Sequence, residues 1–95
     1  MDELTGELIE FRNIRGWEKY HTPENLAKSI CIEAAELLKC FQWGMGWPDS
    51  QNWEDEFADI MIYCLYFAHA MGINIESAVL NKIRKNAVKY KLKNV

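Results

Sequence analysis

The chain has 95 residues, which predicts one domain spanning residues 1–95 and excludes a second hydrophobic core. Hydrophobic residues make up 49% of the chain and charged residues 26%, proportions that exclude a disordered or fibrous protein. The net charge of −3 argues against a protein that coats a nucleic-acid polymer, because phosphate binding depends on an excess of lysine and arginine.

Four segments with helical periodicity follow one another between chain-breaking residues. The breakers are Gly16, Pro23, the 44–48 turn and Gly72. The first segment, about 2–14, has Leu4, Leu8 and Phe11 at helical spacing. No segment shows the alternation of a half-buried β-strand, so the sequence predicts helices only.

The second segment begins with two start signals, Thr22 as an N-cap and Pro23 at the first helical position. Its apolar stripe contains one carboxylate. The stripe consists of Leu26, Ile30, Glu33, Leu37 and Phe41. We therefore expect Glu33 to face inward.

The third segment, about 52–71, has an apolar stripe and is apolar on every side in its second half. The stripe consists of Trp53, Phe57, Ile60, Cys64, Phe67 and Met71. Because a helix that is apolar all round needs cover on all sides, we expect a second subunit to bury Ile62, Leu65 and Tyr66.

The fourth segment follows Asn74, which is a candidate N-cap. Its expected core face consists of Ala78, Val79, Ile83 and Ala87. Together the segments predict an all-α, antiparallel four-helix bundle. The twelve aromatic residues exceed what one small core holds, which indicates a homo-oligomer.

The cysteines and the apolar stretches bear on the compartment. Cys31, Cys40 and Cys64 have neither CxxC nor zinc-site spacing and are interpreted as reduced core thiols. The N-terminus lacks a secretory signal pattern, which predicts a cytoplasmic protein. The longest apolar stretch contains Asp59 and His69 and is too short to span a bilayer, so no membrane partner is expected.

Two pairs of acidic residues are spaced to share a helix face, Glu33 with Glu36 and Glu56 with Asp59. Antiparallel packing of the second and third segments can bring the pairs together. Four ionised carboxylates repel unless cations neutralise them, and oxygen ligands select Mg²⁺ or Mn²⁺. For either pair alone a solvated or salt-bridged surface is the alternative, but Asp59 has apolar neighbours, which favours the metal site.

The C-terminal segment is basic. Residues 81–95 contain six basic and no acidic residues, whereas residues 1–80 contain all 14 acidic ones. Four side chains of the fourth segment share one face and a tyrosine follows; these are Lys82, Lys85, Asn86, Lys89 and Tyr90. A solvated lysine face explains this pattern as well as a phosphate-binding face. Beside a divalent cation, the face would complete a polyphosphate site.

Aromatic side chains lie near the loops at both ends of the second segment; they are Trp17, His21, Trp43 and Trp47. Tryptophan in a small core is one explanation for them. A nucleobase can also stack on such rings, which makes the loop tryptophans candidates for a base site.

These residues together resemble the MazG-like, all-α nucleotide pyrophosphohydrolases, whose pattern is ExxE followed by ExxD. The matching residues are Glu33-Ala34-Ala35-Glu36 and Glu56-Phe57-Ala58-Asp59. Residues 15–23, 41–43, 82–86 and 89–90 are similar to the dCTP pyrophosphatase branch. The resemblance covers nearly the whole chain.

The resemblance implies dimers or dimers of dimers that convert a (deoxy)nucleoside triphosphate to the monophosphate and pyrophosphate, clearing surplus or non-standard nucleotides. It implies Mg²⁺ on Glu33, Glu36, Glu56 and Asp59. It places Trp17 and Trp43 beside the base, and Tyr63, Lys82, Asn86 and Tyr90 near the sugar and phosphates. Vertebrate dCTP-preferring members carry a histidine where this chain has Leu8, so we expect dCTP-like substrates to be favoured only modestly.

Three functions remain open. The leading one is an Mg²⁺-dependent nucleoside triphosphate hydrolase with Glu33 or Glu36 as general base. A second is hydrolysis of phosphoribosyl-ATP or of another nucleotide. The third is a non-catalytic helical dimerisation or binding module, whose acids only pair with the basic segment.

Overall fold

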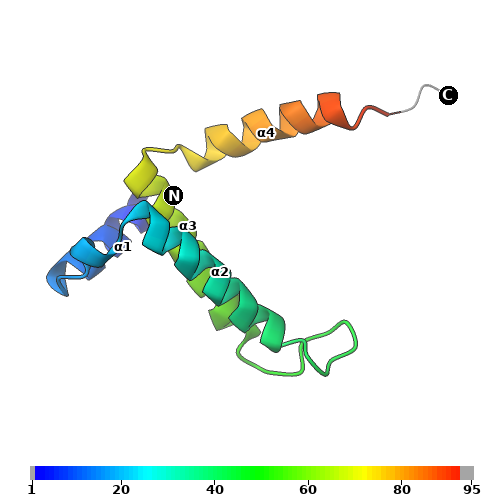
Figure 1. Ribbon diagram of the computed structural model, residues 1–95, viewed down its shortest axis with the longest axis horizontal. Helices are drawn as coiled ribbons and strands as arrows, with labels where there is room; N and C mark the ends of the chain where they lie inside the picture. The colour runs from blue at the N-terminus through cyan, green and yellow to red at the C-terminus, as the bar shows by residue number, and fades with distance from the viewer. Residues whose placement is uncertain (1, 93–95) are drawn as a thin grey trace.

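The computed structural model describes residues 2–92, so the last part of the basic segment, 93–95, lies outside the described residues. The elements are α1 (Asp2–Ile14), the short 3₁₀ helix η1 (Glu18–Tyr20), α2 (Pro23–Lys39), α3 (Trp53–Met71) and α4 (Ile75–Lys89). Figure 1 shows their arrangement. No strand occurs between residues 2 and 92, which confirms the predicted all-α fold of four helices.

The helices begin and end where local chemistry favours it. The Thr22 hydroxyl accepts a hydrogen bond from the Asn25 N–H at 3.2 Å, and the Asn74 side chain accepts one from the Ser77 N–H at 2.9 Å. These contacts satisfy N–H groups that have no partner within the helix. Gly72 ends α3 in the left-handed conformation with φ 66°, which glycine adopts without strain. The predicted N-caps are confirmed.

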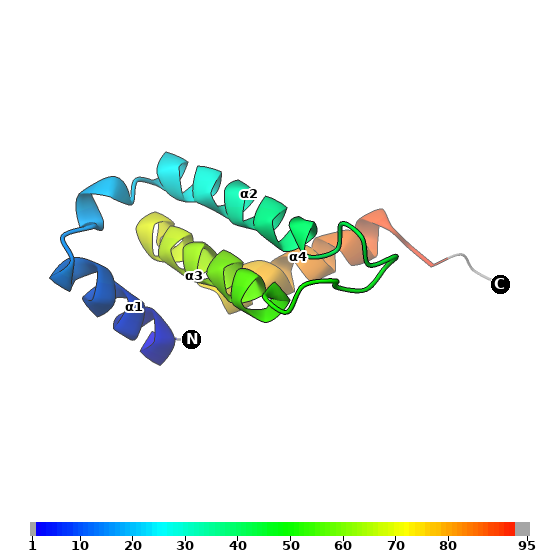
Figure 2. The same cartoon turned by 90° about the horizontal axis from the view of Figure 1, so that it is seen from below.

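The core lies where α2 and α3 run antiparallel, with α1 against the second half of α3 (Figure 2). Its most buried side chains are Leu26, Cys40, Leu65, Tyr66 and Ala68. The Tyr66 hydroxyl donates a hydrogen bond to the Leu8 carbonyl at 2.8 Å and so links α3 to α1. This arrangement turns one face of α2 toward α3, and Glu33 on that face is half-buried as predicted.

The second half of α3 is covered differently from the prediction. Leu65 and Tyr66 are only 3% and 4% exposed within the single chain, so the expected subunit interface through them is wrong. The chain's own α1 and α2 provide the cover. Conversely, Trp53 and Phe57, which were expected in the core, are about half exposed.

The fourth helix extends away from the other three, with a bend of 95° between α3 and α4 (Figure 1). The apolar face expected to pack in the core is therefore exposed; its residues are Ala78, Val79, Ile83 and Ala87. Periodicity identifies an apolar face of a helix but not the surface that covers it. Within one chain, the packed part of the bundle consists of α1, α2 and α3.

The three cysteines differ in how deeply they are buried. All three cysteines are free; Cys40 is buried and Cys64 half-buried, but Cys31 is exposed, so the prediction of a core thiol is wrong there.

Among residues 2–92, no single helix is long and apolar enough to cross a membrane. Only α3 and α4 taken together, as a pair bent by 95°, reach the required length and composition.

Candidate functional site

Three of the four predicted metal ligands converge between α2 and α3. Glu33 on α2 and Glu56 and Asp59 on α3 place carboxylate oxygens within 4.8 Å of one another. The spacing of three between Glu56 and Asp59 puts both on one face of α3, and antiparallel packing sets that face against Glu33. We call these three residues the acid cluster.

The fourth predicted ligand, Glu36, lies at the edge of this cluster. It is one turn along α2 from Glu33, and its Oε2 lies 3.8 Å from Nζ of Lys39 in a partly exposed ion pair. Its charge nevertheless contributes to the electrostatics of the cluster, because it helps to raise the pKa of Glu33. The structure therefore separates Glu36 from the three oxygens that approach one another most closely.

The electrostatics of the acid cluster fit a cation. Burial raises the pKa of Glu33 above its ordinary value of 4.5, and the carboxylates of Asp59, Glu56 and Glu36 raise it further, in that order. A divalent cation would offset both effects, since it supplies positive charge and coordinates carboxylate oxygens. An all-oxygen donor set is the one that Mg²⁺ and Mn²⁺ prefer.

This raised pKa predicts how stability depends on pH when divalent cations are removed. The folded chain holds the Glu33 proton more tightly than the unfolded chain, so the stability contributed by that proton is present below pH 4.5. It is lost as the pH rises through the folded-state pKa. We therefore expect Glu33→Gln to gain thermal stability relative to the wild type as the pH rises above 4.5.

Thermal melts in a chelator, followed by circular dichroism at several pH values, measure this difference. With saturating Mg²⁺ the wild type should recover the stability that it lost. A difference in Tm between wild type and Glu33→Gln that stays constant across the pH range would contradict the raised pKa.

A cavity of about 420 Å³ adjoins the acid cluster at Asp59, between α1 and α3. Its lining is mostly apolar and aromatic and comprises Leu4, Glu7, Leu8, Phe11, Trp17, His21, Asp59, Ile62, Tyr63 and Tyr66. Three predicted nucleotide-binding residues, Trp17, His21 and Tyr63, thus lie together beside a predicted metal ligand. A concave, mainly apolar site with a few polar groups suits a flat aromatic ligand such as a nucleobase.

The position of Trp17 is fixed by its neighbours. Its ring meets that of Phe11 edge to face, with centroids 5.7 Å apart. The Arg15 guanidinium lies 3.5 Å from the Phe11 centroid and 5.7 Å from that of Trp17. These contacts stabilise one orientation of the indole. Trp17 remains 44% exposed, so part of its surface is open to a ligand.

Two residues near this cavity were missed by the sequence reasoning: Tyr66 lines it, and Arg12 lies beside His21 and Tyr66. Tyr66 packs against His21 with ring centroids 4.5 Å apart. Burial raises the pKa of the Tyr66 hydroxyl above 10.0, although the neighbouring Arg12 opposes the rise. Arg12 itself is buried in the last turn of α1. The sequence gives no signal that either residue would contact His21, because Tyr66 lies in an apolar run and Arg12 resembles an ordinary cation at a helix end.

The remaining predicted residues lie elsewhere in the chain. Trp43 is 80% exposed in the 40–52 loop, beyond the opposite end of α2 from Trp17. The predicted phosphate-binding residues lie on or just after α4, which extends away from α2 and α3, the two helices that carry the acid cluster (Figure 1); they are Lys82, Lys85, Asn86, Lys89 and Tyr90. One chain therefore does not bring its basic face to its own acids.

The 40–52 loop that carries Trp43 is held by its own hydrogen bonds. The Trp43 N–H donates to the Asp49 carboxylate at 2.6 Å, and the Asp49 N–H donates to the Cys40 carbonyl at 2.7 Å. Gly44 passes so close to the Trp47 carbonyl that a side chain there would collide with it. The loop therefore presents Trp43 and Trp47 on a closed turn.

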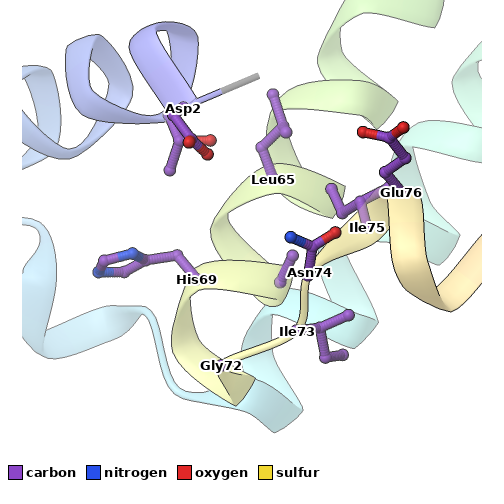
Figure 3. A pocket seen from close by; sticks show the side chains of 10 residues that line it. Asp2, Leu65, His69, Gly72, Ile73, Asn74, Ile75 and Glu76 are labelled. Carbon is purple, nitrogen blue, oxygen red and sulfur yellow. The ribbon is translucent and has the colours of Figure 1, made fainter.

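A second cavity of about 430 Å³ lies at the turn between α3 and α4, next to the start of α1 (Figure 3). Polar groups from Asp2, His69, Asn74 and Glu76 line it. The Asn74 side chain is already used as the N-cap of α4. None of the predicted site residues lines this cavity, so of the two, the one beside Asp59 is the candidate functional site.

Comparison with known proteins gives three findings. A model of the MazG-like family matches residues 28–95. The dCTP pyrophosphatase 1 proteins of Homo sapiens and Mus musculus are 33% and 30% identical over 90 residues, covering 85% of this chain and 53% of each relative. The chain thus spans about half the length of these curated relatives. A pyrophosphatase structure from Archaeoglobus fulgidus is 44% identical, with a TM-score of 0.85, over 97% of this chain and 93% of that one.

Proposed function

Since the chain belongs to the MazG-like family, we propose that it hydrolyses nucleoside triphosphates to nucleoside monophosphates and pyrophosphate, using Mg²⁺. The observation that carries the proposal is the acid cluster of Glu33, Glu56 and Asp59 beside an aromatic cavity. The names of the similar proteins, a pyrophosphatase and dCTP pyrophosphatase 1, support a nucleotide substrate.

In this proposal Glu33, Glu56 and Asp59 hold the divalent cation, Mg²⁺ or Mn²⁺, with Glu36 at its edge. When bound, the cation polarises phosphoryl oxygens and offsets the charge that develops on the pyrophosphate leaving group. Glu36 lies outside the three converging oxygens, so its carboxylate is freer than that of Glu33 to accept a proton from the attacking water. Glu33 is the alternative proton acceptor.

The base of the nucleotide would occupy the cavity beside Asp59. Trp17 supplies a ring on which a base can stack, and such stacking contributes about 1–3 kcal/mol per base. Tyr63, at the cavity wall, lies one turn beyond Asp59 on α3 and suits the sugar. His21 supplies a polar group on the side formed by α1 and the loop after it.

The predicted phosphate-binding residues would come from a second copy of the chain. The exposed apolar residues of α4 favour contact with another protein surface. Its basic face is complementary in charge to the half-exposed acids between α2 and α3. The exposed apolar residues of α4 include Val79, Leu80, Ile83 and Val88. We propose a homodimer or homotetramer in which α4 of one chain approaches the acid cluster of another.

Two alternative functions use the same acids. In a non-catalytic module the acids would pair with the basic segment of a second copy, because the ion pairs of residues 2–92 within one chain join Glu24 to Lys28 and Glu36 to Lys39, each within α2. Hydrolysis of phosphoribosyl-ATP or of another nucleotide uses the same acid cluster and differs only in the ligand. A nucleotide panel separates these functions.

We expect the panel to show hydrolysis of dCTP and its modified relatives, with a modest preference over dTTP, dUTP and dATP. Leu8 lines the cavity with a side chain that cannot read a base edge, and shape alone discriminates by about 10–200-fold. Pyrophosphate release, coupled to an added inorganic pyrophosphatase, gives kcat/KM for each nucleotide in Mg²⁺.

Leu8→His is the matched variant, because it introduces a hydrogen-bonding group at this wall of the cavity and should increase the preference for dCTP. A wild-type preference above about ten-thousandfold would show that another residue reads the base. No hydrolysis of any nucleotide in the panel would favour the binding module.

A further inference from the structure

Arg12 is a buried cation without a carboxylate partner among the described residues. It is 7% exposed, and its side-chain hydrogen bonds join Nε to the Asn13 side-chain oxygen and Nη1 to Nδ1 of His21, both at 3.4 Å. Its guanidinium carbon lies 5.5 Å from the centroid of the Tyr66 ring. Buried arginines are rare unless they are paired, so this placement calls for a role.

The contact with His21 determines which ring nitrogen carries the proton. A guanidinium is always protonated and can only donate hydrogen bonds. Nδ1 of His21 must therefore accept, which requires that it carry no proton. A neutral imidazole then carries its single proton on Nε2, on the other side of the ring.

We propose that Arg12 is a positioning residue that fixes His21 as the neutral Nε2–H tautomer, so that His21 offers only a hydrogen-bond donor to a ligand. His21 lines the cavity beside Asp59 and also a smaller cavity formed with Tyr20, Asn25 and Ser29. The identity of the ligand as a nucleotide rests on the proposed function, whereas the tautomer does not.

The charged and titratable groups around His21 agree with a neutral ring. Burial lowers the pKa of His21 below 6.5, and the Arg12 guanidinium lowers it further. The other titratable groups on the cavity wall are Glu7 from α1 and Asp59, Tyr63 and Tyr66 from α3. The carboxylates of Glu7 and Asp59 favour the charged imidazolium. Arg12 favours the neutral ring and is the charged group within hydrogen-bond distance of it.

A fixed donor has a consequence for the ligand. An Nε2–H group complements a carbonyl or phosphate oxygen, and it cannot accept a hydrogen bond from an exocyclic amino group. Cytosine, uracil and thymine all carry the carbonyl at position 2, whereas only cytosine carries the amino group. His21 would therefore stabilise any pyrimidine nucleotide and add no preference for cytosine.

Nuclear magnetic resonance of the ¹⁵N-labelled protein without nucleotide tests the tautomer. The chain has two histidines, His21 and His69, so a His69→Gln variant assigns both rings. At pH values above 6.5 we expect His21 to show a protonated Nε2 and an unprotonated Nδ1. A protonated Nδ1 of His21 in the wild type would overturn the proposal, and this result does not depend on any Arg12 variant.

Arg12→Gln should release the ring. We expect a mixture of tautomers and a titration midpoint that rises toward 6.5. Arg15→Gln is the matched control, because it also removes one arginine charge. Arg15 lies against Phe11 and Trp17, and its side-chain hydrogen bond goes to the Phe11 carbonyl and not to His21. Arg12→Lys keeps a charged donor and should retain more of the wild-type tautomer than Arg12→Gln. Identical His21 spectra for wild type and Arg12→Gln would also overturn the proposal.

Kinetics provide the functional readout. Loss of one oriented hydrogen bond to a bound ligand should raise KM for dCTP and dUTP in Arg12→Gln by about two- to tenfold, with kcat nearly unchanged. A fall in kcat at constant KM would contradict a role in ligand binding. If the wild type hydrolyses no nucleotide, the proposed function fails, and the spectra still decide the tautomer.

Discussion

Replacing Asp59 with asparagine, or Glu36 with glutamine, is expected to abolish nucleotide hydrolysis and to leave the metal-free fold at least as stable as the wild type. Asp59 supplies one of the three oxygens that lie within 4.8 Å of one another, and an amide neither carries the charge nor binds Mg²⁺ as strongly. Removal of one hydrogen-bond donor to developing charge costs roughly 10²–10³-fold in kcat, and we expect loss of a metal ligand to cost at least as much. In the absence of metal the amide also removes repulsion between like charges.

Asp55→Asn is the matched control for Asp59→Asn. Asp55 lies on the same helix, in the first turn of α3, and is exposed and outside the acid cluster. We expect it to retain both activity and the response of the thermal melt to Mg²⁺, whereas Asp59→Asn should lose both. A large fall in the Tm of metal-free Asp59→Asn would show instead that the acids are structural partners.

Mixing two inactive variants in one heterodimer is expected to restore activity if two chains form each site. Asp59→Asn and Lys82→Ala should each be inactive alone, because one removes a metal ligand and the other a phosphate contact. If α4 acts on the acid cluster of a second chain, a heterodimer of the two variants contains one intact site. Heterodimers purified through two different tags should then regain about half of the wild-type activity, since one of the two symmetric sites is intact.

The pair Glu56→Gln and Asp59→Asn provides the control for this experiment. Both substitutions fall in the acid cluster, so neither site of their heterodimer is intact and no activity should return. No recovery in the Asp59→Asn and Lys82→Ala heterodimer would place α4 outside the partner's site. A compact 11.1 kDa monomer in sedimentation at micromolar concentration would contradict the dimer itself.

Much of the architecture could be predicted from local sequence chemistry. Thr22 and Asn74 mark helix starts because their side chains can accept from the backbone N–H three residues on, and both contacts form. The inward position of Glu33 followed from its place in an apolar stripe. Convergence of Glu33 with Glu56 and Asp59 followed from spacing and antiparallel packing, both of which are regular.

The features that escaped prediction depend on which surfaces meet in space. The pattern of α4 gave an apolar face, but nothing in its periodicity says that the face is exposed within the chain. Leu65 and Tyr66 were assigned to a subunit interface because the sequence does not reveal that α1 covers them. The burial of Arg12 against His21 depends on the path of the chain after α1, which no local rule specifies.

Phosphorus-31 magnetic resonance of the reaction tests the central claim most directly, because it identifies the products of a nucleoside triphosphate without a coupling enzyme. With Mg²⁺ the wild type should yield nucleoside monophosphate and pyrophosphate in equal amounts, and with a chelator in excess it should yield neither. Release of orthophosphate and nucleoside diphosphate, or product formation that is unchanged by the chelator, would contradict the account.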